Sequence, residues 1–291
     1  MPHNMLEPVL PPDLERLIFE LAAYSRPRSM HKLMLVACRV KEWLEPIVYR
    51  VAIVTKEIDG GYLLVRGYPQ ADVARLLSSP TTPLHQSVRN LCLMGSEREA
   101  TAHILSACFR VQNIWGMGPE LKQLLEFGSR LRLKRLHCEL ARLFNVALQT
   151  DFGHPLFAHI THLELFDRPR TMDSFPWAGL ISLPHLTHLA FNGVQCITIC
   201  PDLLRRCPSL RVLLLVVLVD ERPLTAPPPD LLHDGRFVWM VCTEYIKDWH
   251  MGAFTGVDFW SRAEEFIEQR RTGEIDPLQY RIDKDASIHL P

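Results

Sequence analysis

The sequence lacks any apolar run long enough to cross a membrane, and it lacks an excess of charge of either sign. Its longest apolar run extends from Val212 to Val219, which is eight residues against the roughly 20 that span a bilayer. The 32 Lys and Arg are matched by 33 Asp and Glu, so the formal net charge is −1. Proteins that bind a nucleic-acid backbone usually carry a surplus of cations. We therefore expect neither a membrane nor a nucleic-acid partner.

Glycine is scarce, and the short motifs that mark many enzymes are missing. The chain has 14 Gly, with no glycine-rich phosphate loop, no HExxH metal pair and no GxSxG nucleophile turn. Histidines gather between residues 154 and 162 and cysteines between residues 196 and 207, but neither group has the spacing of a zinc site. We expect no catalytic residue, no metal and no cofactor, so the chain is not expected to be an enzyme.

The cysteines and the N-terminus bear on the compartment. None of the eight cysteines forms a CxxC pair, and no basic start followed by an apolar run opens the chain. Without a secretory leader, reduced cysteines in the core are the ordinary expectation. The Asn-x-Ser/Thr glycosylation pattern is also absent. These features favour the cytoplasm or the nucleus.

Residues 8–50 predict three short helices. In the first, Leu14, Leu17, Ile18 and Leu21 recur at i, i+3, i+4 and i+7, so one face is apolar. Phe19 points nearly opposite to that stripe, and a large aromatic side chain there needs a second surface to bury it. The other two helices are expected over Met30 to Arg39 and around Val40, Trp43, Leu44 and Ile47.

The order of these residues resembles the F-box. Its usual form is Leu-Pro, a helix ending in Ile-Phe-x-x-Leu, then Leu-Val-Cys-Lys/Arg followed by Trp, and a closing aromatic-Arg pair. The matching residues are Leu10, Pro11, Leu14, Ile18, Phe19, Leu21, Leu35, Val36, Cys38, Arg39, Trp43 and Tyr49-Arg50. In that family the module binds the adaptor Skp1 and so joins a cullin-based ubiquitin ligase. The resemblance implies that a Skp1-like adaptor is bound by Leu10, Pro11, Leu14, Ile18, Phe19, Val36 and Trp43.

The rest of the chain repeats a short strand followed by a helical or turn stretch. The central apolar residues of these strands step by 23, 22, 27, 26, 24 and 25 residues; they are Leu91, Ile114, Leu136, Leu163, Leu189, Leu213 and Val238. Leucine-rich repeats have periods of about 20–29 residues. The expected fold class is therefore α/β, with a three-helix F-box-like module (8–50), an irregular leucine-rich-repeat solenoid (51–257) and a C-terminal capping helix and tail (258–291). Fungal-type F-box-like proteins with irregular repeats are similar.

The same alternation of strands and helices is also found in doubly wound α/β sheets. Against that alternative, the unit is shorter than the 30 or more residues of a βαβ unit, and no glycine-rich phosphate loop follows a strand. Near the C-terminus, the pattern from Asp258 to Arg271 predicts an amphipathic helix that ends at Gly273. We expect this helix to cap the solenoid.

If the central residue of each strand points inward, its neighbours form a row on the opposite face. From this row we expect substrate recognition by Trp115, Arg135, His137, His162, Glu164 and Trp239. The alternative is that Trp115 and Trp239 are covered by loops or by the C-terminal segment. Val212, Leu214 and Val216 favour such cover, because a strand that is apolar on both faces is buried on both faces. Residues after about 242 are thus expected to fold back over this end.

The first functional hypothesis is a substrate-recognition adaptor of a Skp1–cullin ubiquitin ligase, whose F-box-like helices bind Skp1 and whose repeats bind an unknown protein substrate. The alternative is a non-catalytic repeat scaffold in which these helices only cap the solenoid, with Phe19 packed against the first repeat. A third, weaker class is a hydrolase or a ligand-binding α/β protein, which predicts a deep pocket with convergent polar groups.

Overall fold

The computed structural model describes residues 10–26, 29–55, 68–69, 73, 75, 77, 84–144, 150–168, 176–218 and 227–282. Parts of all three expected domains lie outside these residues: 8–9 and 27–28 of the first, several connecting segments of the second and 283–291 of the tail.

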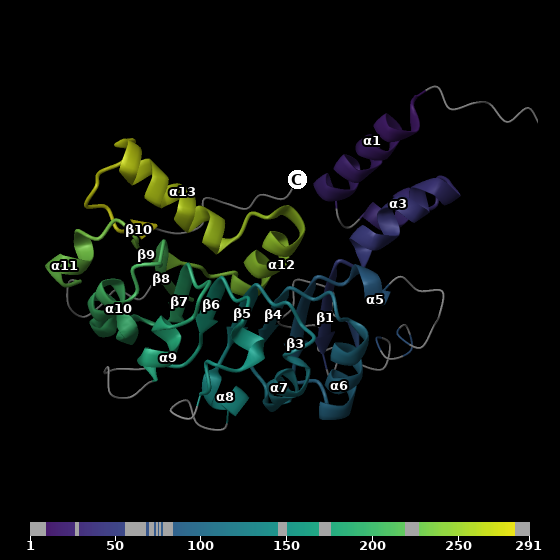
Figure 1. The fold of residues 1–291 in the computed structure, drawn as a ribbon. Helices are drawn as coiled ribbons and strands as arrows, with labels where there is room; N and C mark the ends of the chain where they lie inside the picture. The colour runs from purple at the N-terminus through teal and green to yellow at the C-terminus, as the bar shows by residue number, and fades with distance from the viewer. Residues whose placement is uncertain are drawn as a thin grey trace, which may run out of the picture.

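One ten-stranded sheet runs through the chain, and every pair of neighbouring strands is parallel. The order is β10-β9-β8-β7-β6-β5-β4-β3-β1-β2, so each strand from β4 to β10 lies beside the one that precedes it in the sequence (Figure 1). The strands are β1 Val51–Thr55, β2 Tyr68–Pro69, β3 Asn90–Met94, β4 Asn113–Gly116, β5 Arg135–Cys138, β6 His162–Leu165, β7 His188–Asn192, β8 Val212–Val217, β9 Phe237–Val241 and β10 Arg281–Ile282.

Short helices between the strands cover one face of the sheet, which we call the first face. They follow the lower side of the sheet in Figure 1, from α6 to α11. Leucines of the strands and of these helices form one continuous core. The segments are α5 Leu84–Ser87, α6 Arg98–Ala107, η2 Pro119–Lys122, α7 Gln123–Phe127, α8 Leu140–Phe144, η4 Pro155–Phe157, α9 Trp177–Ile181, η6 Val194–Ile199, α10 Cys200–Arg206 and α11 Pro229–Leu232.

Two longer helices return across the opposite, second face: α12 Tyr245–Thr255 and α13 Phe259–Thr272, which lie above the sheet in Figure 1. Their apolar side chains form a second core with alternate strand residues such as Val212 and Leu214. The expectation that the chain after residue 242 folds back over this end is confirmed. Helix α13 is also confirmed, from its capping box at Asp258 to the left-handed Gly273 (φ 79°).

The expected fold class is wrong. The chain does not form an F-box-like helical module joined to a leucine-rich-repeat solenoid; it forms an α/β fold on a parallel sheet. The physical difference is the second face, which a solenoid leaves open and which α12 and α13 bury here. The short period argued against an α/β sheet because such units usually need a longer helix. The connecting α-helices between β3 and β9 have only four to ten residues, and this is how such short units can still form a parallel sheet.

The register of the seventh predicted strand also needs correction. Six of the predicted central residues, from Leu91 to Leu213, are paired along one row of the sheet. In β9, however, Leu213 pairs with Phe237 and not with Val238. A shift of one residue exchanges the two faces of a strand. Trp239 consequently lies in the core of the first face, fully buried, and not in the expected recognition row.

The N-terminal helices form a small core of their own. They are α1 Pro12–Ser25, α2 Met30–Leu33 and α3 Cys38–Val48. The second is shorter than expected because the backbone is already extended at Ala37, immediately before α3 begins. The buried residues of this core are Ala23, Met30, Val40, Leu44 and Ile47, and Phe254 of α12 packs against it.

We expect Asp258→Ala to lower the free energy of unfolding by about 1–3 kcal/mol. Asp258 accepts the backbone N–H of Ser261 at 3.0 Å and an N–H of Arg135 at 2.6 Å, so its loss weakens both the start of α13 and its link to β5. Urea unfolding measures the change. Glu265→Ala, an exposed change on the same helix, is the control and should stay within about 0.5 kcal/mol of the parent. Equal stability of the two variants would contradict this prediction.

Candidate functional site

An exposed apolar surface lies on the N-terminal helices. Seven large apolar side chains there are between 44% and 84% exposed: Leu10, Leu14, Leu17, Ile18, Leu21, Leu35 and Val36. We call these residues the N-terminal apolar face. Arg39 donates to both carboxylate oxygens of Glu15, at 2.7 and 2.9 Å, and so joins the start of α3 to the first turn of α1. This ion pair brings the segment before α3 to the same end of α1 as Leu14, and the Arg39 guanidinium lowers the pKa of Glu15.

The structure places Phe19 of α1 differently from the expectation. Phe19, predicted to need an outside surface, is half-buried and packs on the core that α1, α2 and α3 share, as does Trp43. The stripe of Leu14, Leu17 and Ile18 is the part without a cover among the described residues. Five of the residues expected to bind an adaptor are exposed: Leu10, Pro11, Leu14, Ile18 and Val36. The other two, Phe19 and Trp43, are half-buried and pack against the core of the three helices.

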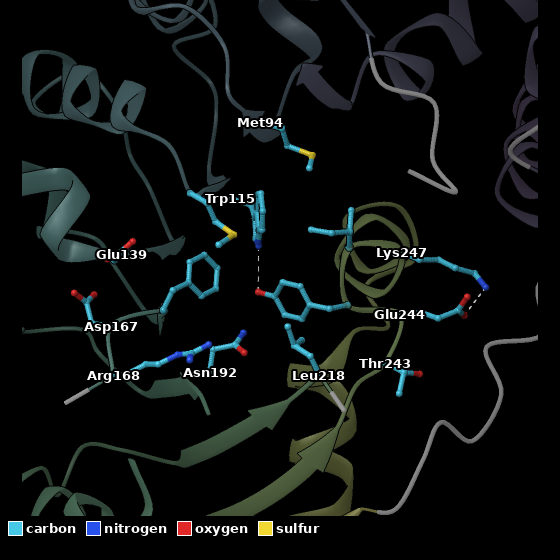
Figure 2. A pocket seen from close by; sticks show the side chains of 14 residues that line it. Met94, Trp115, Glu139, Asp167, Arg168, Asn192, Leu218, Thr243, Glu244 and Lys247 are labelled. Atoms are coloured by element: carbon cyan, nitrogen blue, oxygen red, sulfur yellow. Dashed lines mark hydrogen bonds and ion pairs between the residues drawn. The ribbon is translucent and has the colours of Figure 1, made fainter. Parts of the chain in front are cut away.

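A cavity of about 810 Å³ lies at the carboxyl ends of the strands. Parallel strands bring all their carboxyl ends to one edge of the sheet, where ligands of α/β proteins commonly bind. The lining side chains come from the ends of β3 to β9 and from the first turn of α12 (Figure 2): Met94, Trp115, Met117, Glu139, Phe166, Asp167, Arg168, Asn192, Leu218, Thr243, Glu244, Tyr245, Ile246 and Lys247. We call this cavity the carboxyl-edge pocket.

Three aromatic rings form one wall of this pocket. Trp115 lies 5.8 Å from Phe166 and 6.4 Å from Tyr245, between ring centroids, and Phe166 and Tyr245 are also 6.4 Å apart. The indole N–H of Trp115 donates to the hydroxyl of Tyr245 at 3.2 Å, the dashed line at the centre of Figure 2. These contacts join strand β4 and the end of β6 to α12, so the wall is built from three separate elements.

A buried carboxylate stands behind the aromatic wall. Glu164 is fully buried and accepts hydrogen bonds from the hydroxyl of Tyr245 and from Asn192 (3.3 Å), and its Oε2 lies 2.7 Å from Nδ1 of His137. Burial, followed by the charge of Glu164, raises the pKa of Tyr245, which keeps the proton on the phenol. The ring of His137 meets that of Phe259 edge to face at 6.0 Å. Glu164 thereby fixes the position of α12 and the side chains of the pocket wall.

The residues that were expected to recognise a substrate lie in different parts of the structure. Trp115 lines the carboxyl-edge pocket, whereas His137 and Glu164 lie buried under α12 and α13. Arg135 pairs with Asp258, and Trp239 faces the other core. These residues do not form an open row, because α12 and α13 occupy the face on which that row was expected.

His162 stacks on His188, with ring centroids 4.0 Å apart and planes within 6°, and both rings meet Trp260 edge to face. Nε2 of His188 lies 3.0 Å from Glu264. Burial and the neighbouring His188 lower the pKa of His162 to about 2. Burial also lowers the pKa of His188, although Glu264 opposes that shift. This pair therefore contributes to the packing of α13 in its neutral form.

Most of the pocket lining was not predicted from the sequence, including Tyr245, Phe166, Met117 and Leu218. One signal could have found several of them: each of the residues from Met94 to Leu218 that lines the pocket stands at or just after the carboxyl end of a predicted strand. Tyr245 gave no such signal, because its place depends on how α12 returns across the sheet.

The arrangement can bind an apolar or aromatic group against a wall of rings, with charged side chains at the rim. Within the described residues, no group of three or more His, Cys, Asp or Glu side chains could hold a metal ion. Burial raises the pKa of the Cys108 and Cys196 thiols to about 12, so both stay protonated at neutral pH. Among the helices in the described part of the chain, none is long and apolar enough to span a membrane.

Comparison with known proteins gives no relative: no family model matches the sequence, and a search of curated proteins finds no significant match.

We expect Glu164→Ala to destabilise the protein by about 3–5 kcal/mol, because it leaves the buried donors of Tyr245 and His137, and the partly buried amide of Asn192, without their acceptor. Urea unfolding measures this change, and the near-ultraviolet circular dichroism of the aromatic wall should weaken with it. Glu139→Ala, at the partly exposed rim of the pocket, is the control. An unfolding free energy within about 1 kcal/mol of the parent would contradict the structural role of Glu164.

We expect acid to destabilise the fold below pH 6.5. The pKa of His162 is about 2 in the folded protein, whereas the ordinary value for a histidine is 6.5, so the unfolded chain takes up a proton that the folded chain does not. The free energy of unfolding therefore falls as the pH decreases, by about 1–2 kcal/mol between pH 6.5 and 4.5 after allowing for partial exposure of the ring.

Urea unfolding at several pH values measures this dependence. His162→Gln should make this dependence shallower without removing it, because the pKa of His188 is also lowered in the folded protein, and the exposed His185→Gln should leave it unchanged. The same slope in both variants would show that His162 does not carry the effect.

Proposed function

We propose that the protein is a substrate-recognition adaptor of a Skp1–cullin ubiquitin ligase. Its N-terminal helices bind a Skp1-like adaptor and through it a cullin, and the rest of the chain binds a protein substrate. The adaptor performs no chemistry; it raises the effective concentration of the substrate near the ubiquitin-conjugating enzyme. The eight free cysteines fit work in a reducing compartment, the cytoplasm or the nucleus. The observation that carries the proposal is the N-terminal apolar face, since it lies on residues whose order resembles the F-box.

The energetics of this face favour a partner. The three helices already have a core of their own, with Ala23, Val40 and Leu44 fully buried, and the exposed stripe adds nothing to it. Burying one Leu, Ile or Val side chain is worth about 1.5–3 kcal/mol. Seven such side chains from one short stretch of chain are more than a surface usually leaves in water, and clusters of this kind mark protein interfaces. A helical, largely apolar groove is the surface they would fit.

The carboxyl-edge pocket is the proposed place for the substrate. Its aromatic wall supplies the rigid anchors that interface hot spots favour, and Met117 and Leu218 add exposed apolar surface at its edge. Acidic Glu139 and Glu244 and basic Arg168 and Lys247 surround it, which favours a segment of mixed charge. We propose that an apolar side chain of the substrate packs against this wall of rings, beside Met117 and Leu218.

One contact favours a second candidate, a non-catalytic scaffold whose N-terminal helices only cover the end of the sheet. Phe254 of α12 packs against the core of these helices, so they are attached to the body of the protein. In that case no adaptor binds, and the exposed stripe has no partner. Binding experiments with Skp1 separate the two candidates.

We expect purified Skp1 to bind the wild-type protein and to bind Leu14→Glu/Ile18→Glu at least ~100-fold more weakly, because two charges would enter an apolar interface. Both residues are about half exposed, at 51% and 52%, so the fold should persist. The matched control is Val257→Glu/Leu278→Glu, whose parent side chains are both 53% exposed. It should bind Skp1 like the wild type.

Isothermal titration calorimetry measures the affinities, and thermal unfolding checks that all variants fold. The proposal fails if the wild type does not bind Skp1 under conditions in which a known F-box protein does. It also fails if the two double variants bind equally well.

A further inference from the structure

A second hollow lies at the opposite, amino-terminal edge of the sheet. It has a volume of about 690 Å³ and is bounded by the end of α3, by the residues that precede and begin β3, β4 and β5, and by the end of α12. A smaller hollow of about 420 Å³ adjoins it and shares Arg89, Arg110 and Gln112 with it. We call the two together the basic groove. Its cationic side chains are Arg50, Arg89, Arg110, Arg130, Arg132, Lys134 and Arg135.

No carboxylate lines the groove among the described residues, and little of its charge is neutralised. Arg135 pairs with Asp258 at 2.6 Å, and this is the one ion pair formed by these seven cations within the described ranges. Arg89 donates instead to the backbone carbonyls of Gln86 and Val88, at 2.6 and 3.2 Å. Burial, then the charges of Arg110 and Arg50, lower the pKa of Arg89. The cations thus repel one another in the free protein, and an anion would relieve that repulsion.

The floor of the groove carries an unused hydrogen-bond acceptor. Asn90 and Asn113 are paired residues of β3 and β4, and both are at least nine-tenths buried. Nδ2 of Asn113 donates to Oδ1 of Asn90 at 3.2 Å, and Nδ2 of Asn90 donates to the carbonyl of Ala253 at 3.4 Å. Oδ1 of Asn113 is buried without a hydrogen-bond partner. Since a buried polar atom is normally paired, the floor of the groove contains one acceptor that the protein itself does not satisfy.

We infer that the basic groove binds a small anion that carries two or more phosphate groups. Arg110, Arg132 and Lys134, all exposed at its rim, hold the phosphates through charge-assisted hydrogen bonds. The volume of the larger hollow lies within the range of small-molecule sites, about 300–1,000 Å³. The charge of the whole chain is only −1, so the groove does not simply reflect a basic protein.

A nucleic acid or a phosphorylated peptide would use the same charges over a longer surface. The observations favour a compact ligand, because α3 and α12 close the hollow on two sides and only three strands contribute to its floor. This inference is independent of the proposed adaptor function, since the groove shares no residue with the N-terminal apolar face or with the carboxyl-edge pocket.

Titration calorimetry of the full chain with sodium tripolyphosphate at constant ionic strength tests the inference. We expect the wild type to bind and Arg110→Ser/Arg132→Ser to bind at least ~10-fold more weakly, through the loss of two charge-assisted contacts. Arg206→Ser/Arg211→Ser removes the same charge from two exposed arginines near the amino end of β8, outside the groove, and should bind within about twofold of the wild type. Lys134→Ser provides a second single variant, with an expected loss of about threefold or more.

Thermal unfolding confirms that each variant folds, and the same concentration of tripolyphosphate should raise the melting temperature of the wild type more than that of Arg110→Ser/Arg132→Ser. Absence of binding to the wild type overturns the inference. Equal losses in the two double variants also overturn it, because they would indicate a general effect of charge. Binding of a doubly phosphorylated peptide or of a thymidine oligonucleotide in place of tripolyphosphate would likewise exclude a small-anion site.

Discussion

The apolar contact between the second face of the sheet and helices α12 and α13 constrains most of the other features. Phe259 and Trp260 are almost fully buried in this contact, and the strands beneath them are apolar on both faces. A parallel sheet of this kind is stable only when both faces are covered. Helix α12 covers its part of the second face with 11 residues, about 16 Å of helix. Its first turn lines the carboxyl-edge pocket and its last turn lines the basic groove. One packing event therefore shapes both hollows.

The distribution of charge explains why the composition says so little about ligands. The chain has almost equal numbers of acidic and basic residues, yet the two edges of the sheet differ in charge. The carboxyl-edge pocket has both signs at its rim, whereas the amino-terminal edge holds only cations among its described lining residues. The net charge of the whole chain does not show this difference between the two edges. A balanced composition argues against a protein that is basic throughout, but it does not exclude a local anion site.

Much of the sheet could be predicted because its signals are local. The apolar centre of each strand from Leu91 to Leu213, the helix that begins after Asp258 and the return of the chain over Val212 and Leu214 all follow from short patterns. The fold class could not, because a period near 25 residues fits both an open solenoid and a sheet covered on both faces by short helices. The register of β9 failed for a similar reason: Phe237, Val238 and Trp239 are all apolar, so alternation does not select a face.

The functional surfaces were harder to predict, since they depend on distant segments. Periodicity identified the apolar stripe of α1 but not whether another element covers it, and Phe19 proved to be the side chain that the neighbouring helices bury. From the sequence alone, Glu164 is predicted to be an exposed strand residue. It is buried because α12 and α13 cover it, and Tyr245 of α12, 81 residues later in the sequence, donates a hydrogen bond to it.

The late position of α12 and α13 in the sequence has a consequence for synthesis. Strands β4 to β9 each pair with the preceding strand, so the sheet can grow one neighbour at a time as the chain leaves the ribosome. Its second face stays uncovered until residues 245–272 have emerged, and until then Trp115, Val212 and Leu214 face water. For most of its translation the nascent protein is a one-sided sheet with a growing apolar surface, and the last helices convert it into a closed molecule.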